Sequence, residues 1–260
     1  QKAGAGMELH YAKETEEIQA ELVETMKKEW SNWEKYSDGK WITKKELDAM
    51  KEENPEIKVI PTRWVHTNKS EPNQPRKLKS RLVVRGDLED SSTMRCDLPT
   101  ASQTAMGLVF ALSASRQTDL YGGDISAAFL QGSKLDRILV LAAPKEGIPG
   151  LDFEEEMFYL VSSTAYGTKD APRGWFKNLD STMKVEDFMP LPYEPAAYVL
   201  HPPDGSLAGL VTVHVDDLLW TGGGYIEKKM DAIQAKYNFG KVSVNKFAYC
   251  GHEVLKDERG

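Results

Sequence analysis

The stretch VTVHVDDLLWTG, residues 211–222, places two adjacent aspartates, Asp216 and Asp217, inside an apolar and β-branched run that is typical of a strand. Burying one unpaired carboxylate is costly, and a neighbouring carboxylate raises that cost because the two charges repel. The pattern therefore predicts a tight reversal of the chain at the two aspartates, where solvent or a bound cation offsets their repulsion.

The composition of the chain is that of an ordinary globular protein. Its 260 residues suffice for one large domain or two small ones, with 40% hydrophobic and 28% charged residues. No apolar run approaches the length of a membrane span, so we expect no membrane contact. The two cysteines, Cys96 and Cys250, are too few for a disulfide framework and wrongly spaced for a zinc site, which favours a reducing, intracellular setting. Gln1 at the first position suggests a piece of a longer protein or a processed product.

The charge of the chain is unevenly distributed. The formal net charge of −7 is unexpected for a nucleic-acid enzyme, since phosphate binding normally requires a basic surface. Residues 14–30 are acidic, whereas residues 61–86 hold one acid, Glu71, among the bases Arg63, Lys69, Arg76, Lys77, Lys79, Arg81 and Arg85. The second segment predicts a basic hairpin, and its charge by itself favours an ordinary solvated hairpin face over a nucleic-acid contact.

Hydrophobic periodicity and turn residues predict a mixture of helices and strands. Thr43 and Glu46 form a capping-box pattern, and Ser102 is a candidate N-cap. Apolar spacing predicts helices over residues 11–35, 43–53, 102–117, 171–188 and 225–239, and strands over residues 61–68, 77–86 and 137–142. Because these elements do not alternate as regular βαβ units, we predict an α+β fold with an antiparallel sheet.

Asp124 ends another strand-like run and joins the aspartate pair as a candidate metal ligand. A strand end at Asp124 and a hairpin apex at residues 216–217 would bring three carboxylates together, and clustered anions repel unless a divalent cation neutralises them. Oxygen ligands suit Mg²⁺, and two such ions roughly 3.5–4 Å apart serve polymerases and nucleases. The alternative is structural, since aspartates are common in β-turns.

Several stretches, in order along residues 41–255, resemble the reverse transcriptase of copia-type LTR retrotransposons. KWITKKELDAMKEE and RWVHTNK resemble the family's opening helix and KWV…K strand, and KLKSRLVVRG is similar to its KARLVARG. GGDISAAFLQGSKLDRILVLAAP resembles DVKNAFLHGxLxExIYMxxP, and STAYGTKDAPRGWFKNL resembles SLYGLKQAPRAWYxxL. VTVHVDDLLWTG is similar to LLYVDDILITG, and FAYCGHEV is similar to FLGIEI. Motifs in the right order are far more specific than any one of them.

The resemblance implies a right-hand polymerase with fingers and palm, in which an antiparallel palm sheet packs on helices and a thumb is absent. Residues 41–118 would be a fingers-like region that contains the basic hairpin of residues 61–86. Residues 119–255 would be mainly palm, with some fingers elements, and would end at a primer-grip hairpin. Residues 1–40 would form a poorly matching helical region, and residues 256–260 a truncated tail.

The resemblance also implies roles for individual residues. The catalytic and metal-binding carboxylates would be Asp124, Asp216 and Asp217, with the carbonyl of Ile125 as a further ligand and Mg²⁺, or Mn²⁺ as an alternative, as the metal. The incoming nucleotide would contact Lys69, Arg81, Phe129, Tyr166, Gly167, Lys169 and Lys241, among which Phe129 occupies the steric-gate position. Primer and template would contact His214, Phe247, Tyr249 and Gly251.

The implied function is RNA-directed DNA polymerisation, in which two metal ions promote the transfer of dNTPs to a primer 3′-OH. The implied partners are a primed RNA or DNA template, dNTPs and other parts of a retrotransposon Pol polyprotein, such as RNase H and integrase. The implied location is intracellular, in the cytoplasm, a virus-like particle or the nucleus. Without a thumb, this piece would hold a duplex weakly and would act weakly by itself.

Departures from the family pattern define an alternative function. His214 stands where Tyr is usual before the aspartates, Asp170 stands where Gln is typical, and Thr164 and Thr168 replace apolar or bulkier residues. The alternative is therefore a catalytically inactive or domesticated fragment that acts only as a nucleic-acid-binding module. A metal-dependent hydrolase or nuclease is disfavoured, because no general-base motif accompanies the acids.

Overall fold

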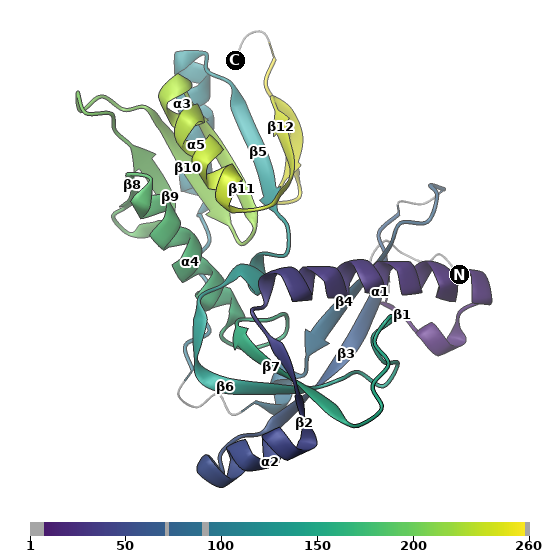
Figure 1. Ribbon diagram of the computed structural model, residues 1–260. Helices are drawn as coiled ribbons and strands as arrows, with labels where there is room; N and C mark the ends of the chain where they lie inside the picture. The colour runs from purple at the N-terminus through teal and green to yellow at the C-terminus, as the bar shows by residue number, and fades with distance from the viewer. Residues whose placement is uncertain (1–7, 71–72, 90–93, 258–260) are drawn as a thin grey trace. The chain divides into compact units, whose positions relative to one another are not determined.

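A computed structural model describes residues 8–70, 73–89 and 94–257 and shows the α+β fold that the sequence predicts (Figure 1). The chain forms two units, each built from two separate stretches: Gln1–Cys96 with Phe129–Gly174, and Asp97–Ala128 with Trp175–Gly260. We refer to them as unit 1 and unit 2. Because each unit is discontinuous in sequence, the contiguous fingers-like and palm ranges stay a prediction.

Unit 1 contains a six-stranded sheet. Its strand order is β1 (Glu8–Leu9), β3 (Val59–Asn68), β6 (Lys134–Ala142), β7 (Met157–Ser163) and β2 (Lys40–Thr43), with β4 (Leu78–Val84) also paired to β3. The β3–β4 pair is the antiparallel hairpin predicted from the basic segment. Strands β3 and β6 are parallel, while the other neighbouring pairs are antiparallel.

The helices of unit 1 begin at identifiable caps. Helix α1 (Glu16–Tyr36) follows Thr15, whose hydroxyl accepts the Ile18 N–H at 3.4 Å. Helix α2 (Lys44–Glu53) begins with the predicted capping box, in which the side chains of Thr43 and Glu46 each bind the other's backbone N–H. Short 3₁₀ segments lie at η1 (Tyr11–Lys13), η2 (Gly86–Leu88) and η3 (Ala128–Gln131).

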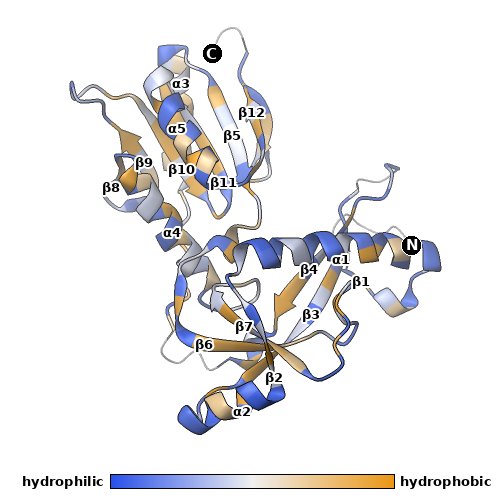
Figure 2. Ribbon diagram, in the orientation of Figure 1, coloured by the Kyte–Doolittle hydropathy of each residue, from blue (hydrophilic) through white to orange (hydrophobic). Residues whose placement is uncertain are grey.

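The apolar side of α1 packs against β4, while the rest of its surface is mostly hydrophilic (Figure 2). Leu22, Met26, Trp30 and Trp33 follow helical spacing and are at most 4% exposed. The ring of Trp30 meets that of Tyr159 edge-to-face at 5.2 Å. The sparse apolar positions of this segment are therefore the docking stripe of the helix.

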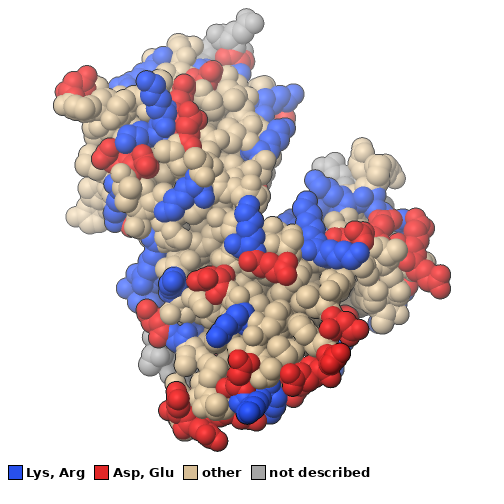
Figure 3. Space-filling model, viewed as in Figure 1, with Lys and Arg blue, Asp and Glu red and all other residues tan. Residues whose placement is uncertain are grey.

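Opposite charges of α1 and the β3–β4 hairpin lie side by side in unit 1 (Figure 3). Arg76 of the hairpin binds Glu17 and Glu21 of α1 at 2.6 and 2.8 Å. Arg63 of β3 binds Glu8 of β1 at 2.5 Å. These pairs are exposed, so each contributes little stability. Their main consequence is that acids of the same chain neutralise part of the basic hairpin.

Unit 2 contains a six-stranded antiparallel sheet with the aspartate hairpin near its centre. Its strand order is β12 (Phe239–Val244), β5 (Leu120–Ile125), β11 (Asp217–Gly222), β10 (Gly209–His214), β9 (Glu194–Leu200) and β8 (Phe188–Leu191). A separate hairpin pairs β13 (Lys246–Tyr249) with β14 (His252–Leu255). The remaining helices are α3 (Gln103–Arg116), α4 (Ala171–Val185) and α5 (Gly224–Lys236).

The middle of this sheet is covered on both faces. Leu218, Leu219 and Trp220, successive residues of β11, are at most 2% exposed. Because successive side chains of a strand point to opposite faces, such a run needs packing partners on both sides. Leu219 clusters with Val109 of α3, and α5 also packs against β11. The apolar residues that follow the two aspartates thus anchor the hairpin in the core.

The predicted helices are confirmed, with small shifts at their ends. Helix α1 starts at Glu16 rather than at residue 11, because residues 11–13 form a separate 3₁₀ segment. Helix α4 ends at Val185 rather than at residue 188, just before Asp187 adopts a φ of 67°. Among the described residues, none of the helices combines the length and the apolar character needed to cross a membrane.

Candidate active site

The predicted reversal at the aspartates is confirmed, since Val215 and Asp216 form the two-residue turn between β10 and β11. Val215 has a φ of 62°, a left-handed conformation that β-branched residues rarely adopt. The Trp175 indole donates to the Val215 carbonyl at 2.7 Å, and the Ile125 N–H donates to the Asp216 carbonyl at 2.8 Å. Surrounding structure therefore fixes a strained turn, which is a common arrangement at functional sites.

Asp124 lies directly opposite Asp217 on the neighbouring strand β5. Like charges at opposed positions of a sheet destabilise it. The pKa of Asp217 is raised above its usual range, first by partial burial and then by the charges of Asp216 and Asp124, while His214 opposes the shift. The strand register thus places Asp124 beside the aspartate hairpin, as predicted, while the metal-binding and catalytic roles of the three carboxylates stay predictions.

The three carboxylates do not form a complete metal cage. Across the described ranges, no group of three or more His, Cys, Asp or Glu side chains is placed to hold a metal ion by itself. Mg²⁺ is often bound through only one or two carboxylates, with waters and substrate phosphates as its other ligands. The opposed pair of Asp124 and Asp217 fits that mode of binding, and the carbonyl of Ile125 follows directly on β5.

A cleft of about 270 Å³ in unit 2 connects the carboxylates with two lysines and the β13 strand. Its lining residues are Gly122, Gly123, Asp124, Asp217, Lys241, Ser243, Lys246, Phe247, Ala248 and Tyr249. A Cβ on Gly122 would lie 2.4 Å from the Phe247 ring, and one on Gly240 would lie 2.8 Å from the Asp124 carboxylate. The close packing at the cleft therefore requires glycine at these two positions. The cleft also places Lys241, a predicted phosphate contact, near the carboxylates.

The predicted primer and template contacts differ in their exposure. Phe247 and His214 are half-buried, and Gly251 is exposed in the turn between β13 and β14, with a φ of 78°. Tyr249 is only 4% exposed and packs in the core of unit 2. Burial raises the pKa of the Tyr249 hydroxyl above its usual range. Tyr249 thus packs in the core and also borders the cleft, whereas Phe247 lines the cleft with a half-buried ring.

In unit 1, three of the predicted nucleotide contacts form one cluster. The Arg81 guanidinium lies over the Tyr166 ring, 5.5 Å from its centroid. The Phe129 ring meets the same ring edge-to-face at 5.9 Å. The Tyr166 carbonyl accepts the Val84 N–H at 2.7 Å. Segments far apart in the sequence thus present one cation and two aromatic rings at the same place.

Lys69 and Lys169, two further predicted nucleotide contacts, have other surroundings in unit 1. Lys69 follows the end of β3, whereas Arg81 pairs with Val65, so the backbone positions of the two residues lie roughly 13 Å apart along the strand. The Lys169 ammonium donates to the carbonyl of Glu89 at 3.1 Å. The structure therefore gives Lys169 a partner within the fold and does not bring Lys69 into the Arg81 cluster.

Arg137 and Glu89 are residues of this region that the sequence does not single out. Arg137 forms ion pairs with Asp170 at 3.1 Å and with Glu89 at 2.9 Å. The sequence signal is indirect, since of these three residues only Asp170 departs from the family pattern. The charge that Asp170 adds near the predicted nucleotide contacts is therefore paired with Arg137, which it shares with Glu89.

Gly167 is expected to tolerate no larger residue. It has a φ of 91°, and a Cβ there would lie 2.2 Å from the Val84 carbonyl oxygen. We expect Gly167→Ala to lower the free energy of unfolding by at least about 3 kcal/mol, because it adds backbone strain to a clash with main-chain atoms. Urea unfolding measures the loss.

Gly147→Ala is the matched control for this substitution. Gly147 also lies in unit 1 and has a φ of 71°, but nothing lies within 4 Å of the position of its Cβ. The control should therefore lose only about 1–2 kcal/mol, from backbone strain alone. Equal losses in the two variants would contradict the close packing of Gly167.

Comparison with known proteins agrees with the motifs that form this site. The model of the family described as reverse transcriptase (RNA-dependent DNA polymerase) matches residues 48–260. The retrovirus-related Pol polyprotein from transposon RE2 of Arabidopsis thaliana is 25% identical over 194 residues, which cover 71% of this chain. The retrovirus-related Pol polyprotein from transposon TNT 1-94 of Nicotiana tabacum is 26% identical over 147 residues, which cover 55% of it. The matches span 13% and 11% of those two proteins, and the resemblance to copia-type retrotransposon Pol polyproteins is confirmed.

Proposed function

The chain belongs to the reverse transcriptase (RNA-dependent DNA polymerase) family, and from that premise we propose that it transfers dNTPs to a primer 3′-OH with the aid of two metal ions. The observation that carries the proposal is the convergence of Asp124, Asp216 and Asp217 at a strained hairpin turn beside a cleft. Phosphoryl transfer depends on positioning and on stabilising negative charge, which metal ions held by clustered carboxylates provide.

The carboxylates and one carbonyl supply oxygen ligands. Asp124, Asp216 and Asp217, with the carbonyl of Ile125, would hold Mg²⁺ or Mn²⁺, both of which prefer oxygen donors. Bound by these residues, such ions would supply activation of an attacking hydroxyl and neutralisation of charge on the leaving phosphates. Lys241 lines the same cleft and supplies a positive charge for a phosphate.

The cluster of Arg81, Tyr166 and Phe129 supports nucleotide binding by unit 1. The Arg81 guanidinium is a fixed positive charge that suits a triphosphate. The two aromatic rings offer apolar surfaces for the sugar and the base, and the Phe129 ring is the proposed barrier to a 2′-OH. Arg81, Tyr166 and Phe129 receive these roles because each stands at the matching position of a family motif.

The setting of the activity is also a proposal. The relatives named above are Pol polyproteins, and we propose that this chain acts within such a polyprotein, together with RNase H and integrase parts. Its proposed substrates are a primed RNA or DNA template and dNTPs. The proposed location is intracellular, in the cytoplasm, a virus-like particle or the nucleus.

His214 favours a second candidate function, a catalytically inactive module that only binds nucleic acid. It pairs with Asp217 across the hairpin, at a position where the family pattern has Tyr. The surroundings of one carboxylate therefore differ from those implied by the family motif. Binding without chemistry is the behaviour that distinguishes this candidate from the polymerase.

Primer extension by the full chain on primed RNA and DNA templates tests the proposal. We expect templated incorporation of dNTPs with Mg²⁺ and none in the presence of EDTA, because the carboxylates act through bound metal. Fluorescence anisotropy measures binding of the same primed templates. Binding without incorporation, with Mg²⁺ and with Mn²⁺, would favour the binding-only module and overturn the polymerase.

Phe129→Ala is expected to increase the incorporation of rNTPs relative to dNTPs by about 10- to 100-fold, because the lost ring leaves room for a 2′-OH. The ratio of kcat/KM for the two nucleotides measures the change. Phe153→Ala is the matched control, since Phe153 is an exposed ring of unit 1 that packs against Trp41. An unchanged ratio in a Phe129→Ala variant that still incorporates dNTPs would contradict the steric-gate role.

A further inference from the structure

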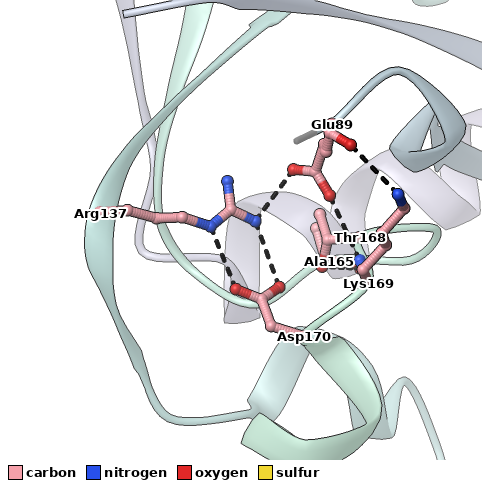
Figure 4. A network of polar contacts seen from close by, with 6 residues as sticks. All are labelled: Glu89, Arg137, Ala165, Thr168, Lys169 and Asp170. Carbon is pink, nitrogen blue, oxygen red and sulfur yellow. Dashed lines mark hydrogen bonds and ion pairs between the residues drawn. The ribbon is translucent and has the colours of Figure 1, made fainter. Parts of the chain in front are cut away.

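A largely buried ion-pair network in unit 1 is not explained by the family-derived roles (Figure 4). Arg137 of β6 contacts two carboxylates: its Nη2 lies 2.9 Å from Glu89 Oε1, and its Nε and Nη2 donate to the two oxygens of Asp170 at 3.1 and 3.2 Å. The Glu89 side chain is 2% exposed, and those of Arg137 and Asp170 are 25% and 22% exposed. One guanidinium therefore pairs with two carboxylates, of which Glu89 is fully buried and Asp170 is partly exposed.

Glu89 also binds the loop between β7 and α4. Its Oε2 accepts the Lys169 N–H at 3.2 Å, and its carbonyl accepts the Lys169 ammonium at 3.1 Å. Within the loop, the N–H and the hydroxyl of Thr168 donate to the Ala165 carbonyl at 3.2 and 3.0 Å. Figure 4 shows these groups converging from Glu89, β6 and the loop. Residues 165–170 are thus tied to a buried carboxylate.

The same loop carries Tyr166, the centre of the cluster that we assign to nucleotide binding. The Tyr166 carbonyl is bound to the Val84 N–H at 2.7 Å, so this end of the loop is fixed to β4. The other end is fixed by Glu89 and Asp170. A buried carboxylate that loses its partner retains an uncompensated charge, so removal of Arg137 would disturb this second end most.

We propose that Arg137 is a positioning residue for nucleotide binding: by joining Glu89 to Asp170, it fixes the loop of residues 165–170 and thereby the Tyr166 ring. This inference rests on the proposed function. The planar guanidinium holds two acids at once in a geometry that an ammonium reproduces poorly. Asp170, in place of the family's Gln, is then one partner of an ion pair that holds the loop of the nucleotide-binding cluster.

Hydrogen exchange of the loop amides tests this role without any need for activity. In Arg137→Gln we expect the Lys169 amide to exchange at least about tenfold faster, because its acceptor Glu89 loses its ion-pair partner. Arg76→Gln is the matched control, since Arg76 also joins two acids in unit 1, but at exposed positions. The control should leave the loop unchanged. Loop exchange in Arg137→Gln equal to that of the wild-type chain would overturn the proposal.

Steady-state kinetics provides the functional readout. We expect Arg137→Gln to raise the KM for dNTP by more than it lowers kcat, because the loop that carries Tyr166 loosens while the reacting groups stay in place. Arg137→Lys should restore only part of the loss. The double variant Arg137→Gln/Asp170→Asn should be no worse than the more damaging single variant, because both substitutions remove the same interaction. Additive losses would contradict the pairing.

The outcomes separate this inference from the function on which it rests. An unchanged KM in Arg137→Gln, in a chain that extends primers, overturns the positioning role alone. A wild-type chain that extends no primer overturns the proposed function, while the exchange measurement still decides whether Arg137 holds the loop. If Arg137→Gln does not fold, Arg137→Lys, which keeps the positive charge but not the planar fork that joins Glu89 to Asp170, supplies both measurements.

Discussion

Asp217→Asn is expected to abolish templated primer extension, with a loss in kcat of at least about 1,000-fold. The amide removes a negative charge that would hold Mg²⁺, and metal ions contribute several kcal/mol to the stabilisation of phosphoryl-transfer transition states. Asparagine has nearly the same shape as aspartate, so the hairpin should still form. Single-nucleotide extension of a primed RNA template measures the loss.

The same substitution is expected to stabilise the metal-free protein at neutral pH. Burial and the charges of Asp216 and Asp124 raise the pKa of Asp217, so the folded state favours its protonated form. The stability that protonated Asp217 contributes to the fold is complete below the ordinary pKa of aspartate. It is lost as the pH rises through the raised pKa. Asparagine is neutral at every pH. The melting temperature of Asp217→Asn should therefore exceed that of the wild-type chain near pH 7.5, and the two should be equal near about pH 3.5.

Asp231→Asn is the matched control, since Asp231 is an exposed aspartate on α5 of the same unit. It should change neither extension nor the pH dependence of melting. Lost activity together with lost stability in Asp217→Asn would indicate damage to the fold. Retained extension would contradict the catalytic role of Asp217.

Glu29→Gln is expected to raise the free energy of unfolding by up to about 3 kcal/mol near pH 8 and to change it little near pH 4. Glu29 lies on the side of α1 that packs against β4, and it is only 5% exposed. Burial raises its pKa to about 7, although the charges of Lys79 and Arg81 and the N–H of Leu82 oppose the shift.

The sign of this effect follows from proton binding. The folded protein binds the Glu29 proton more tightly than the unfolded chain does, so stability is full at low pH and is lost as the pH rises from about 4.5 to about 7. Glutamine stays neutral over this range. Urea unfolding at the two pH values measures the difference, with Glu24→Gln, an exposed substitution on the same helix, as the control. A gain from Glu29→Gln that is equal at both pH values would contradict the raised pKa.

Local features of the aspartate hairpin could be predicted from the sequence because few contacts decide them. Two adjacent aspartates in a β-branched run cannot both be buried, so a turn at this place follows from the residues alone. A second strand-like run ends at Asp124, which predicts that this residue lies near the aspartate hairpin. The register of β5 and β11 places Asp124 opposite Asp217, as predicted. The capping box of Thr43 and Glu46 is equally local.

The interleaving of the two units could not be predicted in this way. Strand β3 pairs in parallel with β6, although the chain forms β5 of unit 2 between them. Apolar periodicity indicates which side of an element is buried but not which element covers it. For the same reason, the acidic residues 14–30 and the basic residues 61–86 are visible in the sequence as separate segments, whereas their ion pairs are not.

Buried polar groups are the least predictable part of the candidate site. Asp170 is visible as a departure from the family pattern, but its partner Arg137 lies 33 residues away in the chain. Glu29 has the sequence context of a surface glutamate on a charged helix, and only packing against β4 shows that it is buried. Tyr249 likewise matches a primer-contact motif, yet its side chain lies in the core.

The central claim is that Asp124, Asp216 and Asp217 form the catalytic centre of a DNA polymerase. Single-turnover incorporation of one dNTP opposite a template base tests it most directly, with Asp124→Asn beside the wild-type chain and Asp231→Asn as the control. We predict Mg²⁺-dependent addition of the complementary nucleotide by the wild-type chain and by the control, and no detectable addition by Asp124→Asn. Incorporation that persists in Asp124→Asn, or none by the wild-type chain with either Mg²⁺ or Mn²⁺, would contradict the claim.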